Sequence, residues 1–180
     1  MTFDDSQVLQ SIENLLRGMG YDFTSPEMKD TPMRVRDYWK ERLSGREIDL
    51  SKELVAMPGE LTPCPIILEH VPFTSTCEHH LAPFEGEVTL GYLPGAHGIV
   101  GLSKLVRVVQ TFAWRLQVQE RMTHQIARAL EDYLKPEAWA VKVVGTHTCM
   151  SHRGVKTPHV PVTTVVLGGR WKDDPPSQFA

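Results

Sequence analysis

The sequence is poor in cysteine and has no long apolar run, and each shortage excludes a class of protein. Three cysteines in 180 residues are too few, and an odd number, for the disulfide framework of a small secreted domain. No apolar stretch approaches the length of a membrane span, and two acidic residues stand near the N-terminus where a signal peptide would be basic. We therefore expect a protein of the reducing cytoplasm.

Basic residues are missing from the middle of the chain and concentrated after it. Residues 61–100 contain four acidic residues and no lysine or arginine, whereas residues 101–172 contain eleven basic residues against four acidic ones. A basic half suits a phosphate-bearing substrate, although solvated helix surfaces explain part of this excess. The net charge of -3 and the absence of a groove-reading motif argue against a nucleic-acid partner.

The chain divides by pattern into a helical arm and a larger domain. Apolar residues recur with helical period over residues 5–19 and again over residues 31–43. A linker rich in proline, residues 46–65, follows. These features predict an N-terminal helical arm with linker over residues 1–60 and a catalytic domain over residues 61–180.

The larger domain reads as strands, then helices, then strands. Strands are predicted to begin at residue 66 and to cover residues 85–93, 139–149 and 160–167. Residues 103–134 carry a helical pattern, and one straight helix of that length would run about 48 Å. We expect a break near residues 117–118, which gives an antiparallel helix pair. The polar C-terminal tail is predicted to fray. The fold class is α+β with an antiparallel sheet.

Two cysteines and a histidine form the strongest chemical pattern. Cys77 and His80 stand three residues apart, a spacing suited to metal ligands, and Cys149 offers a second thiolate. Two thiolates and one imidazole leave a tetrahedral zinc with one open position for water or a substrate atom, as in catalytic sites. His79 and His147 lie beside the ligands as candidate acid and base. For Cys77 and His80 to share a metal, the chain must turn between them.

The two cysteines also admit other interpretations. They could form a disulfide, or they could be unrelated core thiols. The flanking histidines and the expected reducing compartment favour the metal. Cys64 has no such neighbours and is interpreted as an ordinary small residue.

Four segments, in order along nearly the whole chain, resemble the GTP cyclohydrolase I family. They are Ser75-Thr76-Cys77-Glu78-His79-His80, Gly101-Leu102-Ser103-Lys104-Leu105 with Arg107, Gln117-Val118-Gln119-Glu120-Arg121, and His147-Thr148-Cys149 with Arg153-Gly154. Four motifs in the family's order are far more specific than any one of them alone.

The resemblance implies a tunnelling fold, in which a four-stranded antiparallel sheet carries two helices on one face. It also implies a homodecamer of two stacked pentamers with active sites between subunits. The implied reaction opens the imidazole ring of GTP hydrolytically and releases C8 as formate. Rearrangement of the ribose and ring closure then give 7,8-dihydroneopterin triphosphate.

The resemblance also assigns roles to named residues. His79 would be the main proton donor, and His147 would handle water or later protons. Ser103 is either a helix N-cap or a proton carrier. The remaining candidates bind substrate: Lys104, Arg107 and Arg153 the phosphates, and Gln119 and Glu120 the guanine. Zn²⁺ is the expected cofactor, held by Cys77, His80 and Cys149.

The chain departs from the family pattern at two positions. Asp37 stands where a basic residue is usual after the Thr-Pro-x-Arg of the second helix, and His152 precedes the phosphate candidate Arg153. Two other functions stay open from the sequence: a relative that acts on another pterin or deazapurine precursor, and a non-catalytic ring scaffold stabilised by zinc. Sister pterin synthases use three histidine ligands, which the two cysteines here argue against.

Overall fold

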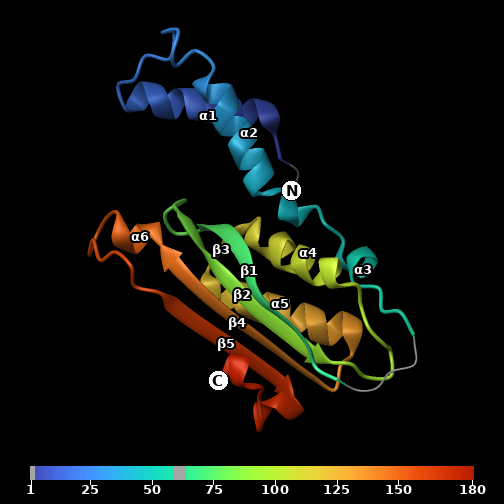
Figure 1. Cartoon of the computed structure of the whole chain (residues 1–180). Helices are drawn as coiled ribbons and strands as arrows, with labels where there is room; N and C mark the ends of the chain where they lie inside the picture. The colour runs from blue at the N-terminus through green and yellow to red at the C-terminus, as the bar shows by residue number, and fades with distance from the viewer. Residues whose placement is uncertain (1–2, 59–63) are drawn as a thin grey trace. The chain divides into compact units, whose positions relative to one another are not determined.

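The computed structural model describes residues 3–58 and 64–180 (Figure 1). The chain separates into two compact units, Met1–Ser44 and Gly45–Ala180. The boundary predicted between residues 60 and 61, and part of the predicted linker, lie outside the described residues.

The first unit contains the two predicted helices, α1 (Asp5–Gly18) and α2 (Thr31–Arg42). The side chain of Asp4 caps α1 by accepting a hydrogen bond from the Gln7 amide at 3.0 Å. Pro32 stands in the first turn of α2, where its missing N–H costs nothing. Lys40 of α2 contacts Asp5 of α1 at 2.9 Å, so the two helices form one hairpin-like unit.

The second unit is built on a five-stranded mixed sheet with the order β3-β1-β2-β4-β5. Four long strands are antiparallel neighbours: β1 (Ile66–Cys77), β2 (Pro83–Leu93), β4 (Ala138–His147) and β5 (Val162–Gly169). The prediction of four antiparallel strands was incomplete, because the two-residue strand β3 (Leu116–Gln117) pairs in parallel with the end of β1. The backbone at the predicted helix break is extended, so these two residues can pair with β1 at the edge of the sheet.

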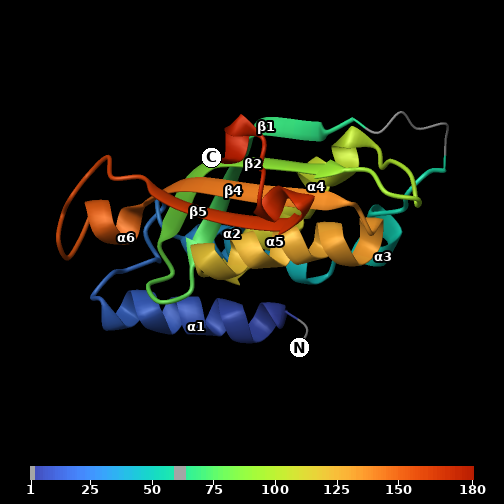
Figure 2. The same cartoon turned by 90° about the horizontal axis from the view of Figure 1, so that it is seen from below.

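Two helices, α4 (Leu102–Ala113) and α5 (Gln119–Leu134), cover one face of this sheet. Helix α4 packs against β1, and α5 packs against β4 and β5 (Figure 2). Their apolar faces and the inward-facing strand residues form one core that includes Val88, Leu105, Val108, Ile126 and Val141. The break expected in the pattern over residues 103–134 is confirmed. No helix among the described residues has the length and apolar character needed to cross a membrane.

Short helical segments complete the fold. They are the 3₁₀ turn Ser44–Arg46, α3 (Leu50–Glu53), α6 (Thr148–Ser151) and the 3₁₀ turns Arg170–Lys172 and Ser177–Phe179. Strand β4 ends at His147, two residues earlier than predicted. Cys149 therefore lies in the turn of α6 and not on the strand.

The C-terminal tail is packed and does not fray as predicted. Trp171 and Phe179 are buried in a second apolar cluster with Ala138 and Ala140 of β4. Their rings stack with centroids 5.9 Å apart. The two aromatic side chains hold the tail against the sheet although most of its residues are polar, because each ring buries a large apolar area. The tail thereby covers part of the sheet opposite the helices.

Replacing Phe179 with alanine should lower the free energy of unfolding by about 3 kcal/mol, since a buried aromatic ring is lost. Chemical denaturation at a fixed protein concentration measures this difference. Val155→Ala, at a residue that is 72% exposed, is the control and should change stability by less than about 0.5 kcal/mol. Equal stability of the wild type and the Phe179 variant would contradict the packed tail.

Candidate active site

The predicted metal ligands converge at one end of the sheet. One ligand atom each from Cys77, His80 and Cys149 lies within 4.8 Å of the other two. The structure contains all three cysteines of the chain as free thiols, so the disulfide interpretation is not supported. This group could hold a metal ion.

The donor set and its dimensions fit zinc. With ordinary Zn–S and Zn–N bond lengths, a tetrahedral centre separates a sulfur and a nitrogen ligand by about 3.6 Å. Cys77 Sγ lies 3.6 Å from His80 Nδ1. Burial raises the pKa of the Cys149 thiol, and the adjacent Cys77 sulfur raises it further, because neighbouring thiolates repel each other. A divalent cation between the two sulfurs would remove that repulsion.

A tight turn after β1 places the first two ligands, as the sequence predicted. The Cys77 carbonyl accepts hydrogen bonds from the amides of His80 and Leu81, and the Cys77 amide donates to Ala82. Leu81 adopts a positive φ of 52°. The Glu78 carboxylate pairs with the Arg121 guanidinium of α5, which ties the turn to the helix layer. His79 projects from this turn with 64% of its side chain exposed.

His147, the last residue of β4, is held on two sides. Its ring stacks on Phe84 of β2 at a centroid distance of 4.6 Å and an interplanar angle of 7°. Its Nε2 lies 2.9 Å from Oε1 of Gln119. Burial lowers the pKa of His147, and the negative charge of Glu120 partly offsets that effect. The imidazole is therefore favoured in its neutral form.

The Gln119 amide determines which nitrogen of His147 carries the proton. Its amide nitrogen lies 2.9 Å from the Val162 carbonyl, 3.2 Å from Thr164 Oγ1 and 3.3 Å from the Val143 carbonyl. With the nitrogen donating to these acceptors, the amide oxygen must face His147, and it can only accept. Nε2 of a neutral His147 is then the protonated nitrogen, and Nδ1 keeps its lone pair.

Gln119 is therefore buried inside the protein, a position that the sequence did not predict. The residue is 1% exposed, and its amide is committed to contacts inside the protein. Gly145 makes room for it, because a Cβ at that position would lie 2.7 Å from Oε1 of Gln119. A glycine inside a strand two residues before a candidate base is a sequence signal of such close approach. Its neighbour Glu120 is exposed in the first turn of α5.

A cavity of about 440 Å³ opens beside His147. Its lining includes Glu85, Thr148, Ser151 and the three histidines His147, His152 and His159. It adjoins the loop after α6, and polar and apolar groups line it in about equal measure. We take it as the space nearest to the candidate base.

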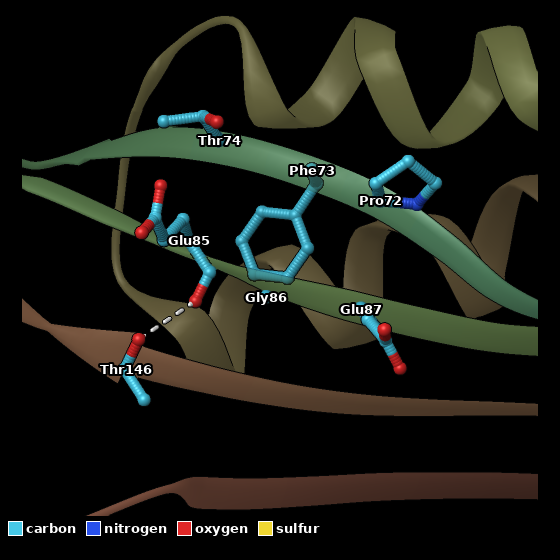
Figure 3. A pocket seen from close by; sticks show the side chains of 7 residues that line it. All are labelled: Pro72, Phe73, Thr74, Glu85, Gly86, Glu87 and Thr146. Carbon is cyan, nitrogen blue, oxygen red and sulfur yellow. Dashed lines mark hydrogen bonds between the residues drawn. The ribbon is translucent and has the colours of Figure 1, made fainter. Parts of the chain in front are cut away.

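A second hollow of about 490 Å³ lies on the sheet itself, lined by β1, β2 and β4. Figure 3 shows the side chains of Glu85 and Glu87 on β2, and the hydrogen bond from Thr146 Oγ1 to the Glu85 carbonyl, 3.4 Å long. Both carboxylates are exposed, and Glu87 also contacts His70 at 2.6 Å. Two carboxylates repel a polyphosphate, so this hollow does not suit the phosphates of a nucleotide.

The two phosphate candidates on α4, Lys104 and Arg107, both bind one carboxylate, a contact that the sequence did not predict. Oε2 of Glu53, on α3, accepts from Lys104 Nζ at 2.9 Å and from Arg107 NH1 at 3.1 Å. Both cations lie on one face of α4, three residues apart. Gly101 is the N-cap of this helix, so the interpretation of Ser103 as the cap is wrong. Ser103 is exposed in the first turn.

Within one chain the site residues form two separate groups. The Ser75 hydroxyl donates to the Ala113 carbonyl at 2.7 Å, so the C-terminal end of α4 lies beside the strand that leads to Cys77. Lys104 begins the same helix about 14 Å away along its axis. Figure 1 shows α3 beside this start of α4. The metal group and the first phosphate candidates thus occupy opposite ends of α4.

Arg153 is the exception among the phosphate candidates. Its NH1 lies 2.7 Å from His80 Nε2, so its charge stands next to the metal group. His152, the departure from the family pattern, is exposed and lies 2.7 Å from Ser151 through its Nδ1.

A family model described as GTP cyclohydrolase I matches residues 8–179. The chain belongs to the GTP cyclohydrolase I family. GTP cyclohydrolase 1 of Streptococcus suis is 40% identical over 168 residues, which cover 93% of this chain and 90% of that protein. GTP cyclohydrolase 1 of Dehalococcoides mccartyi is 42% identical over 175 residues, covering 96% of this chain and 92% of that protein.

One solved structure, the archaeosine synthase QueF-Like in the apo form, is similar to part of this GTP cyclohydrolase I family member. It shares 17% sequence identity at a TM-score of 0.48, and the match covers 61% of this chain and 97% of that chain.

Replacing Cys149 with serine should remove bound zinc, because a neutral hydroxyl is a poor substitute for a thiolate. Elemental analysis of the purified protein measures the metal content. Cys64→Ser is the matched control, since Cys64 is exposed and lies outside the ligand group, and it should keep its zinc. Full metal occupancy in the Cys149 variant would contradict the three-ligand assignment.

Proposed function

We propose that the protein is a zinc-dependent GTP cyclohydrolase I. The observation that carries the proposal is the convergence of the Cys77, His80 and Cys149 ligand atoms within 4.8 Å of one another, beside a histidine held in one tautomer. The reaction opens the imidazole ring of GTP with water and releases C8 as formate. Rearrangement of the ribose and closure then give 7,8-dihydroneopterin triphosphate.

Zinc would be held by Cys77, His80 and Cys149, and when bound it supplies Lewis acidity at its open coordination position. Two thiolate ligands would nearly cancel the charge of the ion, so Cys77 and Cys149 would leave it less acidic than neutral ligands would. Proton transfer by protein side chains is then needed to make up the difference.

His147 and His79 divide this proton transfer. The unprotonated Nδ1 of His147 is the acceptor for the proton of the water that adds to C8. Gln119 accepts from Nε2 at 2.9 Å and keeps the ring in that orientation, so we assign it a positioning role. His79, exposed on the adjacent turn, donates a proton to N7 as the ring opens. Ser103 would carry a proton in the later rearrangement of the ribose.

Glu120 is the proposed reader of the guanine base. Guanine presents N1–H and the 2-amino group side by side, and an ionised carboxylate offers two acceptor oxygens in matching geometry. Glu120 is exposed at the start of α5 and close enough to His147 to affect its pKa. Gln119 was predicted to add a base contact, but its amide already has partners in the protein.

Lys104, Arg107 and Arg153 are the proposed triphosphate ligands. Lys104 and the metal group lie at opposite ends of α4, which favours a site completed between subunits. A second copy would bring its α4 start toward the metal group of the first. This agrees with the homodecamer of two stacked pentamers that the family resemblance implies. The tunnelling fold and the domain boundary near residue 60 belong to the same proposal.

The purified zinc-loaded protein should convert GTP to formate and a pterin that becomes fluorescent after oxidation. ATP should be converted with roughly 10⁴-fold lower efficiency, because adenine leaves the Glu120 carboxylate without its two donors. Fluorescence and formate release measure turnover together. Equal use of ATP, or no pterin from GTP, would contradict the proposed function.

Glu120→Gln should lower kcat/KM for GTP by at least about 10²-fold, since one acceptor oxygen becomes an NH₂ donor that opposes a guanine donor and the remaining hydrogen bond loses its charge. Glu131→Gln, at an exposed carboxylate on the same helix, is the matched control and should keep its activity. Zinc content should be equal in both variants. Normal GTP turnover in Glu120→Gln would show that another residue reads the base.

Gln119→Leu should lower turnover by roughly 10²-fold, because His147 loses the partner that holds its tautomer. Zinc content should be unchanged. Gln125→Leu is the control: Gln125 on the same helix accepts from Gln117 Nε2 at 2.7 Å and has no part in the proposed reaction. If the Gln119 and Gln125 variants were equally active, the positioning role of Gln119 would be wrong.

A further inference from the structure

Glu53 bridges Lys104 and Arg107, the two cations that are proposed to bind the triphosphate. One carboxylate oxygen accepts from both Lys104 and Arg107, at 2.9 Å and 3.1 Å. The Glu53 side chain is 22% exposed, Lys104 34% and Arg107 55%. Hydrogen bonds from Lys104 and then Arg107 hold the pKa of Glu53 below its ordinary value, so the carboxylate is charged at neutral pH.

The backbone around Glu53 is anchored, so the carboxylate is a fixed part of the fold. Asp49 caps α3 by accepting a hydrogen bond from the Ser51 amide. Leu54, the next residue after Glu53, is 3% exposed in the main core. Further along, Met57 and Ile99 exchange backbone hydrogen bonds of 2.7 Å and 3.2 Å. Glu53 therefore stands between two attachments to the domain.

The start of α4 is an anion site by its charge, and Glu53 already occupies part of it. Lys104 and Arg107 supply two full positive charges, and the free amides at the N-terminus of this 12-residue helix add a partial one. One carboxylate leaves the group with a positive excess. A triphosphate carries more negative charge than a carboxylate and offers more acceptor oxygens, so it can replace Glu53 as the partner of both cations.

We propose that Glu53 is a built-in competitor for the triphosphate, which lowers the affinity of the α4 cations for substrate and product alike. This inference rests on the proposed phosphate-binding role of Lys104 and Arg107. Both GTP and the dihydropterin product carry the triphosphate, so contacts to it are uniform and tighter binding does not speed the chemical step. A fixed negative charge beside the cations weakens the hold on both molecules and favours release of the product.

The direct test measures inorganic tripolyphosphate binding to the full-length protein by calorimetry, without turnover. Glu53→Gln keeps the shape of the side chain and removes its charge, so tripolyphosphate should bind roughly tenfold more tightly than to wild type, as expected for one nearby charge at a protein surface. In the GTP assay the same variant should show a lower KM with no rise in kcat. Glu53→Ala should shift the affinity in the same direction.

Two further variants keep this inference separate from the proposed function. Lys104→Ala should weaken tripolyphosphate binding, and if it does not, the phosphate-binding role itself is wrong. Glu137→Gln breaks another exposed carboxylate–arginine pair, Glu137 with Arg170 at 2.9 Å, and should leave the affinity unchanged. Weaker or unchanged binding in Glu53→Gln, while Lys104→Ala loses affinity, would overturn the competitor role and leave the phosphate site intact.

Discussion

The buried amide of Gln119 is the contact on which the candidate site depends. Its nitrogen donates toward acceptors on β4 and β5, and its oxygen accepts from His147. An unpaired amide at a position that is 1% exposed would cost free energy, so the whole set of contacts must form together. The Gln119 side chain thereby joins the start of α5 to both strands and favours one tautomer of His147.

The division of the site into two groups follows from the length of α4. One end of the helix is joined to β1 through Ser75 and Ala113, while the other end carries Lys104 and the bond to Glu53. A rigid helix cannot bring its own ends together. In the proposed enzyme this separation favours a nucleotide site to which two copies of the chain contribute.

Patterns of local spacing predicted much of this structure from the sequence. The turn after Cys77 was predictable, because two ligands three residues apart cannot share a metal on an extended strand. The break between α4 and α5 was predictable from length alone. Contacts between distant segments were not. Glu53 lies 51 residues from Lys104, and no periodicity connects them. The burial of Gln119 depends on the glycine at 145 and on Thr164, which only the folded sheet brings together.

Because β4 ends at His147, the candidate base and the metal ligand Cys149 lie on different elements, whereas the sequence predicted both on one strand. His147 belongs to the sheet, where its ring is held by Phe84 and Gln119. Cys149 belongs to the short α6 turn, followed by an exposed loop. The second thiolate is thus carried by a short helical turn, and the ring of the candidate base is carried by the sheet. In the proposed enzyme, metal affinity and proton transfer would therefore depend on different segments, open to separate adjustment as relatives of this chain diverge.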